Sequence, residues 1–168
     1  MKNTGTLAVT TPTPNQIVLT RVFNAPRTLV FDAFTRPELL KRWFGPRGWL
    51  LVTCEVDLRV GGHFRFVLRS PEGNHMGMRG TYRQIDAPYR SVHVESFDDL
   101  PGESEVVTEL AEREGKTVLT ATITYTSHEI RDAVIKSGME HGAAESYDRL
   151  AELLQLLSPA ELEGVTRS

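Results

Sequence analysis

The chain has 168 residues and a mass of 18.8 kDa, a size that fits one domain with a substantial buried core. With 40% hydrophobic and 24% charged residues, the composition is that of an ordinary globular protein. A net charge of -3 at pH 7 argues against a nucleic-acid partner, because such proteins usually carry a basic field that neutralises phosphates.

The N-terminal segment is rich in Thr and Pro, and it lacks the charged start and the continuous apolar core of a signal peptide. No later run approaches the roughly 20 apolar residues of a membrane span. We therefore expect a cytoplasmic protein without a membrane partner, comprising a disordered leader at 1–15, one domain at 16–157 and a tail at 158–168. Cys54 is the only cysteine, which excludes an internal disulfide and a thiolate metal cluster.

The first predicted element is a strand from Ile17 to Phe23, in which apolar residues alternate with polar ones. Pro26 and Pro37 each suit the first turn of a helix, so two short helices should follow this strand. Gly45 directly precedes a proline and ends the second helix. We expect the two helices to plug one end of a sheet.

A series of strands bounded by turn residues is predicted from about residue 53 to residue 125. The last of them, residues 117–125, places Leu119 and Tyr125 on one face and threonines on the other. This pattern is typical of a sheet with one buried and one solvent-exposed face. Every connection between these strands is short. Short connections indicate an antiparallel meander.

A long helix is predicted from His128 to Leu157, and it closes the chain. From residue 143 its apolar residues form a stripe at helical spacing, made of Ala143, Ala144, Tyr147, Leu150, Ala151, Leu154 and Leu157. The sheet must cover this stripe. The predicted fold is therefore α+β, a curved antiparallel sheet wrapped around a long C-terminal helix.

Several short motifs are shared with a known family, and they spread over residues 16–157. They are Phe23-Asn24-Ala25-Pro26-Arg27 with Phe31 and Ala33, Trp43-Phe44-Gly45-Pro46, Cys54 to Gly62, Gly80-Thr81-Tyr82 with Ile85 to Pro88, and Gly138-Met139-Glu140. On these residues the chain resembles the Aha1-like branch of the START/Bet v 1-like helix-grip superfamily, whose members are similar to the C-terminal domain of the activator of Hsp90 ATPase. The resemblance implies a helix-grip fold and a gap between the helix and the sheet.

The chain departs from this family pattern in two respects. Ala143 stands where similar proteins tend to carry Trp just after the Met-Glu-x-Gly motif, which should leave unfilled volume unless Tyr147 occupies it. We also expect no room for the separate N-terminal domain with which a full Hsp90 activator binds its chaperone.

Aromatic, Met and small side chains expected to face inward would suit a pocket for an apolar ligand. These candidate ligand-binding residues are Trp43, Phe64, Phe66, Met78, Phe97, Met139, Ala143 and Tyr147. The alternative is that the same residues simply fill a core, which periodicity alone does not separate from a pocket.

A polar pair on one strand is the candidate for chemistry. His93, Glu95 and Phe97 share a face, so if Phe97 faces the helix, His93 and Glu95 face it too and form an acid/base pair. The alternative is that this face looks outward and both groups are solvated. No His or carboxylate spacing indicates a metal site, and no nucleotide motif indicates a cofactor. Arg21, like other strand arginines, is expected to be exposed.

Three functions follow as hypotheses. The first is non-enzymatic binding of a small hydrophobic molecule between the helix and the sheet. The second, carried by the resemblance, is an Hsp90-associated, stress-response or co-chaperone-like module. The third is a polyketide-cyclase-like enzyme in which His93 and Glu95 move protons. The oligomeric state stays open, although an edge strand from Ile17 to Phe23 could pair with a second copy.

Overall fold

The computed structural model describes residues 6–157, so residues 1–5 of the expected leader and the expected tail at 158–168 lie outside the described residues. The strands are β1 (Ala8–Thr10), β2 (Gln16–Phe23), β3 (Leu50–Val56), β4 (His63–Arg69), β5 (His75–Asp86), β6 (Arg90–Phe97), β7 (Ser104–Arg113) and β8 (Lys116–Tyr125). The helices are α1 (Arg27–Thr35), α2 (Pro37–Trp43), α3 (His128–Lys136) and α4 (Met139–Leu156).

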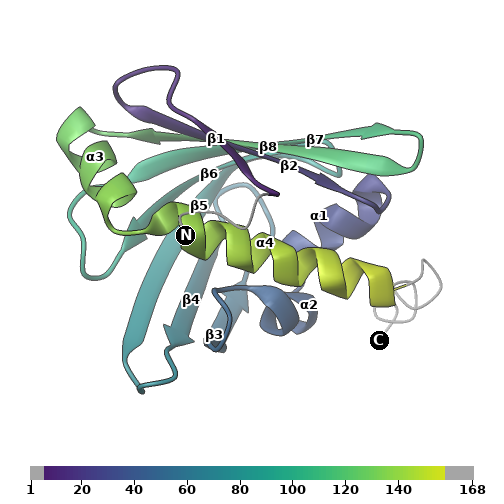
Figure 1. Ribbon diagram of the computed structural model, residues 1–168, viewed down its shortest axis with the longest axis horizontal. Helices are drawn as coiled ribbons and strands as arrows, with labels where there is room; N and C mark the ends of the chain where they lie inside the picture. The colour runs from purple at the N-terminus through teal and green to yellow at the C-terminus, as the bar shows by residue number, and fades with distance from the viewer. Residues whose placement is uncertain (1–5, 158–168) are drawn as a thin grey trace.

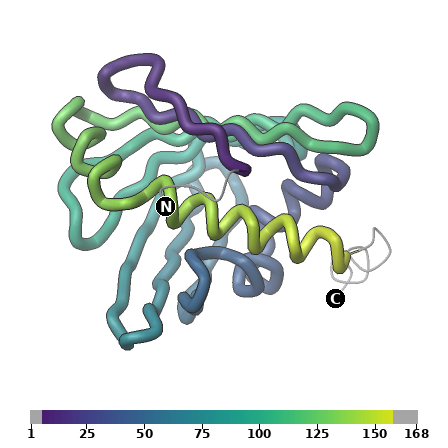
Figure 2. Tube along the Cα trace, in the orientation of Figure 1, coloured from purple at the N-terminus to yellow at the C-terminus, as the bar shows by residue number. Residues whose placement is uncertain are grey.

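The strands form one antiparallel sheet in the order β1-β2-β8-β7-β6-β5-β4-β3. The sheet curves around α4, which crosses its concave side, while α1 and α2 lie near one end of α4 and α3 lies at the other (Figure 1). The path of the chain through this arrangement is a meander after α2 (Figure 2). The predicted α+β helix-grip architecture, with two short helices after the strand at residues 16–23, is confirmed.

The N-terminal segment contains a short strand that the sequence analysis missed. Residues 8–10 were expected to belong to a disordered leader, and they form β1, which pairs antiparallel with β2. Leu7 is buried in the main core, which gives this segment an apolar anchor. Because β1 covers β2, the segment from Ile17 to Phe23 is not a free edge, and the edges of the described sheet are β1 and β3.

The closing helix is divided in two, where one long helix was expected. Gly138 has φ +87°, a left-handed conformation that ends α3 and redirects the chain into α4. Ser127 caps α3 through a hydrogen bond that its hydroxyl accepts from the amide of Ile130. No residue of α3 is buried, so α4 alone supplies the helix that the sheet grips.

The core lies between α4, the concave face of the sheet and the two short helices. Trp43 is fully buried, and its indole nitrogen donates a hydrogen bond to the carbonyl of Ala33 at 2.9 Å. Ser146 on α4 accepts a hydrogen bond from the amide of Gly45 at 3.0 Å. These bonds fix the two short helices against one another and against α4.

An ion pair ties α4 to the sheet, and it corrects an expectation. Arg21 was expected to be an exposed strand charge, but its side chain is only 10% exposed. Its Nη1 donates to Asp148 Oδ1 at 2.6 Å and to the hydroxyl of Thr6 at 2.8 Å. Arg21 is buried because its strand position faces α4, where a carboxylate compensates the charge.

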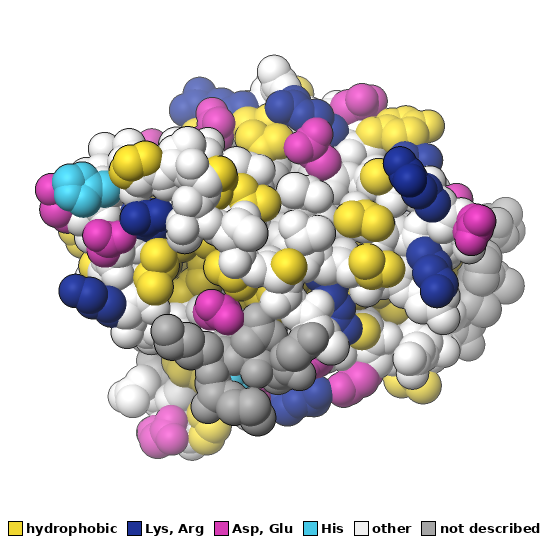
Figure 3. Space-filling model, turned by 45° about the horizontal axis from the view of Figure 1, so that its top comes forward, with side chains coloured by type: hydrophobic (Ala, Val, Ile, Leu, Met, Phe, Trp, Pro, Cys, Tyr) yellow, Lys and Arg dark blue, Asp and Glu magenta, His cyan; other side chains and the backbone are white. Residues whose placement is uncertain are grey.

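The outer surface mixes both signs of charge. On the face shown in Figure 3, Lys and Arg side chains are interspersed with Asp and Glu rather than gathered into one patch. Within residues 6–157, no helix is long and apolar enough to cross a membrane.

Candidate functional site

The register of β5 and β6 decides which way the polar pair faces. Met78 lies opposite Phe97 and Tyr82 lies opposite His93 in this antiparallel ladder, and Met78 and Tyr82 are buried in the core. Residues directly opposite one another point to the same face of a sheet. His93, Glu95 and Phe97 therefore all lie on the inner face, and the alternative of an outward, solvated pair is wrong.

The two groups contact each other directly. His93 Nε2 donates to Glu95 Oε1 over 2.7 Å, and the two side chains are 18% and 14% exposed. The imidazole packs edge-on against the ring of Phe64, with ring centres 5.1 Å apart. Glu95 Oε2 has no hydrogen-bond partner among residues 6–157 and is not sealed from water. The carboxylate therefore keeps one oxygen available to a ligand.

Two tyrosines share the electrostatic environment of this carboxylate. Burial and, next, the negative charge of Glu95 raise the pKa of Tyr125 and of Tyr147 above the ordinary value. Neither hydroxyl has a hydrogen-bond partner among the described residues, and neither is sealed from water. Unpartnered hydroxyls near a half-free carboxylate are the polar lining that a binding site would use to orient a ligand.

The predicted ligand-binding residues fall into two groups. Four are buried in the core, at 7% exposure or less, namely Trp43, Phe64, Phe66 and Met78. Four are half-buried and pack against that core, namely Phe97, Met139, Ala143 and Tyr147. The half-buried group comes from β6 and α4, the elements that face each other across the concave side. The role of both groups in ligand binding stays a prediction.

Tyr147 sits one helical turn after Ala143 and occupies space beside it. Its ring lies 6.1 Å from that of Phe23, 6.2 Å from that of Phe34 and 6.3 Å from that of Trp43. This aromatic cluster fills the end of the molecule next to the two short helices. Ala143 itself is half-buried and packs against the core.

Two hollows open on the surface of the described part of the chain. One, of about 580 Å³, lies between α1, the loop after β3 and the turn after β5. The other, of about 480 Å³, is lined mainly by polar residues of β4, β5 and β6, and Phe64 and Glu95 are part of its lining. None of the α4 candidates, Met139, Ala143 and Tyr147, lines either hollow.

The surroundings of Cys54 favour a structural role over a chemical one. Burial raises the pKa of the Cys54 thiol to about 11, which keeps it protonated and disfavours a nucleophilic role. Among residues 6–157, no three His, Cys, Asp or Glu side chains come together in a group that could hold a metal ion. His93 and Glu95 lie on the same inner face and contact each other, and catalysis stays a prediction.

An antiparallel sheet curved around a C-terminal helix, with two short helices at one end, defines the chain as a helix-grip protein of the START/Bet v 1-like superfamily. The sequence model of the family described as "Activator of Hsp90 ATPase homolog 1-like protein" matches residues 24–155. The chain belongs to this family, in agreement with the resemblance seen in its motifs. No curated protein matches it.

Solved structures of similar proteins agree with this assignment. A crystal structure of a Rhodobacter sphaeroides protein is 32% identical with a TM-score of 0.85, and the match covers 90% of this chain and 99% of that one. A Nitrosomonas europaea protein is 29% identical with a TM-score of 0.78, over 87% and 97%. A Plasmodium falciparum protein described as an HSP90 activator is 29% identical with a TM-score of 0.52, over 66% and 72%. The fold and family together support a ligand-binding or Hsp90-associated module.

Proposed function

We propose that the protein binds a small, mostly apolar molecule between α4 and the sheet, without catalysing a reaction. The observation that carries this proposal is the partly exposed pair of His93 and Glu95 on a mainly apolar inner face. His93 and Glu95 keep 18% and 14% of their side chains exposed although they face α4. A packed core would seal such groups or leave no polar atom there.

The ligand would contact an apolar wall and a polar handle at the same time. Phe97 and Met139 supply adaptable apolar surface from opposite sides, and both are half-buried. The free oxygen of Glu95 would accept a hydrogen bond from a ligand hydroxyl or amine, and the hydroxyl of Tyr125 would donate or accept another. The preferred ligand is therefore an apolar skeleton that carries at least one hydrogen-bond donor.

A thermal-shift screen with lipids, sterols and aromatic compounds tests this function. A ligand that binds only the folded chain stabilises it by about 2.7 kcal/mol at 100 times its Kd. Compounds with a hydroxyl should raise the Tm more than their methyl ethers, and the variant Glu95→Ala should lose that preference. The variant Glu145→Ala, on α4 and distant from the pair in sequence, is the control. A flat screen across all classes would count against the proposal.

A second candidate is an Hsp90-associated role, and it rests on the similarity to the Plasmodium falciparum HSP90 activator. It predicts that the chain is retained on an Hsp90 chaperone from its own organism and changes the rate of ATP turnover by that chaperone. Retention and stimulation would support this role, and absence of both would reject it without affecting the small-molecule proposal.

A further inference from the structure

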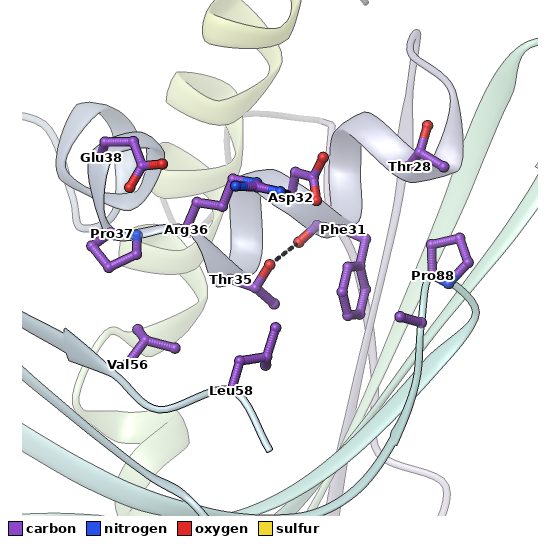
Figure 4. A pocket seen from close by; sticks show the side chains of 11 residues that line it. Thr28, Phe31, Asp32, Thr35, Arg36, Pro37, Glu38, Val56, Leu58 and Pro88 are labelled. Carbon is purple, nitrogen blue, oxygen red and sulfur yellow. Dashed lines mark hydrogen bonds and ion pairs between the residues drawn. The ribbon is translucent and has the colours of Figure 1, made fainter. Parts of the chain in front are cut away.

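The larger of the two surface hollows described above lies at the α1 end of the molecule. It has a volume of about 580 Å³, within the range of small-molecule sites. Phe31 and Thr35 of α1 point toward Leu58, which belongs to the loop after β3, and Pro88 of the β5–β6 turn closes one side (Figure 4). We refer to this hollow as the α1 groove.

The floor of the α1 groove is apolar and partly exposed to solvent. Leu58 is 41% exposed. Phe31 is buried at 9% exposure, and Val56 is half-buried. Leaving apolar side chains in water forgoes the free energy of burial, so a ligand with an apolar body would gain by covering them.

The polar rim of the groove contains a guanidinium group with unused hydrogen bonds. Arg36 Nε approaches Asp32 Oδ1 at 3.4 Å, is sealed from water and has no hydrogen-bond partner. Its two terminal nitrogens have no acceptor among residues 6–157 and are not sealed. A guanidinium group offers five N–H donors, and a half-buried one normally uses them. Asp32 forms an ion pair with Arg36 through Nε, and the two terminal nitrogens remain unused within the described part of the chain.

We propose that the α1 groove binds an amphipathic carboxylate, with the apolar body of the ligand on Phe31 and Leu58 and its carboxylate on the terminal nitrogens of Arg36. A carboxylate matches the planar fork of a guanidinium group and forms two parallel hydrogen bonds with it. This site shares no lining residue with the predicted inner-face site. It is independent of the proposed function.

The test uses a matched pair of probes, 4-phenylbutyrate and 4-phenylbutan-1-ol, titrated into the full chain and followed by methyl NMR and calorimetry. The carboxylate should shift the methyl signals of Leu58 and bind more tightly than the alcohol. Arg36→Gln should weaken binding of the carboxylate by about tenfold or more, because it removes charge-assisted hydrogen bonds, and should leave the alcohol unaffected. Equal affinity of the carboxylate for Arg36→Gln and the wild type would overturn the proposal.

Two further variants keep the test decisive if Arg36→Gln fails to fold. Asp32→Asn removes a competing carboxylate and should tighten binding of 4-phenylbutyrate, while Arg36→Lys should weaken it because ammonium lacks the bidentate fork. Unchanged affinity in both variants would overturn the proposal. Shifts at Met78 and Met139 without shifts at Leu58 would also overturn it, and would place the probe on the inner face instead.

Discussion

His93 Nε2 and Glu95 Oε1 lie 2.7 Å apart on the concave face of the sheet, two residues apart on β6. The register shows that the pair faces α4, because Tyr82 lies opposite His93 and is buried in the core. Burial of a charged group is costly unless the group is paired, and the imidazole supplies that partner. The other carboxylate oxygen, Oε2, has no hydrogen-bond partner among residues 6–157.

The first prediction concerns the two tyrosines near this carboxylate. Glu95→Gln should lower the pKa of Tyr125 and of Tyr147, because the anion that disfavours tyrosinate is removed. Burial remains in the variant, so both values should stay above that of a free tyrosine. NMR titration of the ring carbons measures the change, with exposed Tyr89 as an internal control. An unchanged titration of Tyr125 and Tyr147 would mean that the charge of Glu95 does not reach them.

The second prediction concerns the ion pair between β2 and α4. Asp148→Ala should reduce the free energy of unfolding by about 2–3 kcal/mol, because it leaves the buried guanidinium of Arg21 without its carboxylate. Glu152→Ala is the matched control, since Glu152 pairs with Arg47 at an exposed site on the same helix. The control should cost at most about 1 kcal/mol.

Urea denaturation measures both variants, and a double-mutant cycle separates the pair from its surroundings. Arg21→Met combined with Asp148→Ala should cost less than the sum of the single changes, because no charge is left unpaired. Additive losses would show that the pair contributes no coupling.

The third prediction compares two Gly→Ala changes. At Gly80, a Cβ atom would lie 2.4 Å from the ring of Phe64 and 2.5 Å from the carbonyl oxygen of Val94, so Gly80→Ala should destabilise the fold by about 1–3 kcal/mol. At Gly142 in α4, the nearest atom is 3.4 Å away on Pro46. Gly142→Ala should stabilise the fold by about 0.5–1 kcal/mol through helix propensity. The same sign of Tm change in both variants would contradict this packing.

The fourth prediction concerns two carboxylates with opposite pH behaviour. Burial raises the pKa of Asp32 above its ordinary value of 3.8, so ionisation of Asp32 destabilises the fold as pH rises through the folded-state pKa. Asp32→Asn should therefore be more stable than the wild type at pH 7, with the advantage lost below about pH 4.

Asp98 provides the opposite case. Two hydrogen bonds from Arg65 lower its pKa below 3.8, so its contribution is present at neutral pH and is lost as pH falls through the lowered value. Asp98→Asn should be less stable than the wild type at pH 7, and the two should converge in acid. Unfolding free energies measured from pH 2 to pH 7 would contradict both assignments if Asp32→Asn and Asp98→Asn changed in the same direction.

Strand periodicity and turn residues were sufficient to predict most of the fold. The alternation through Leu119 and Tyr125 placed one face of β8 inward, and short connections predicted the meander. The direction in which His93 and Glu95 face was left open, because a single strand has two equivalent faces until its neighbours are known. The register with β5 settled it.

Features that depend on contacts between residues far apart in the chain were not predicted from the sequence. Arg21 was expected to be exposed because its carboxylate partner lies 127 positions away on α4, and no local pattern links the two residues. The break at Gly138 was missed because one glycine weakens a helix by only about 1 kcal/mol, which does not outweigh a long periodic pattern. The α1 groove was missed because Phe31, Leu58 and Pro88 come from separate elements with no shared spacing.

The most direct test of the binding function is methyl NMR of the methionines, of which the chain has four. Met78 on β5 and Met139 on α4 line opposite sides of the inner face. A compound that raises the Tm should shift both methyl signals together in the wild type, and Glu95→Ala should reduce its affinity. Stabilisation by a compound that leaves both signals in place would contradict a binding site between α4 and the sheet.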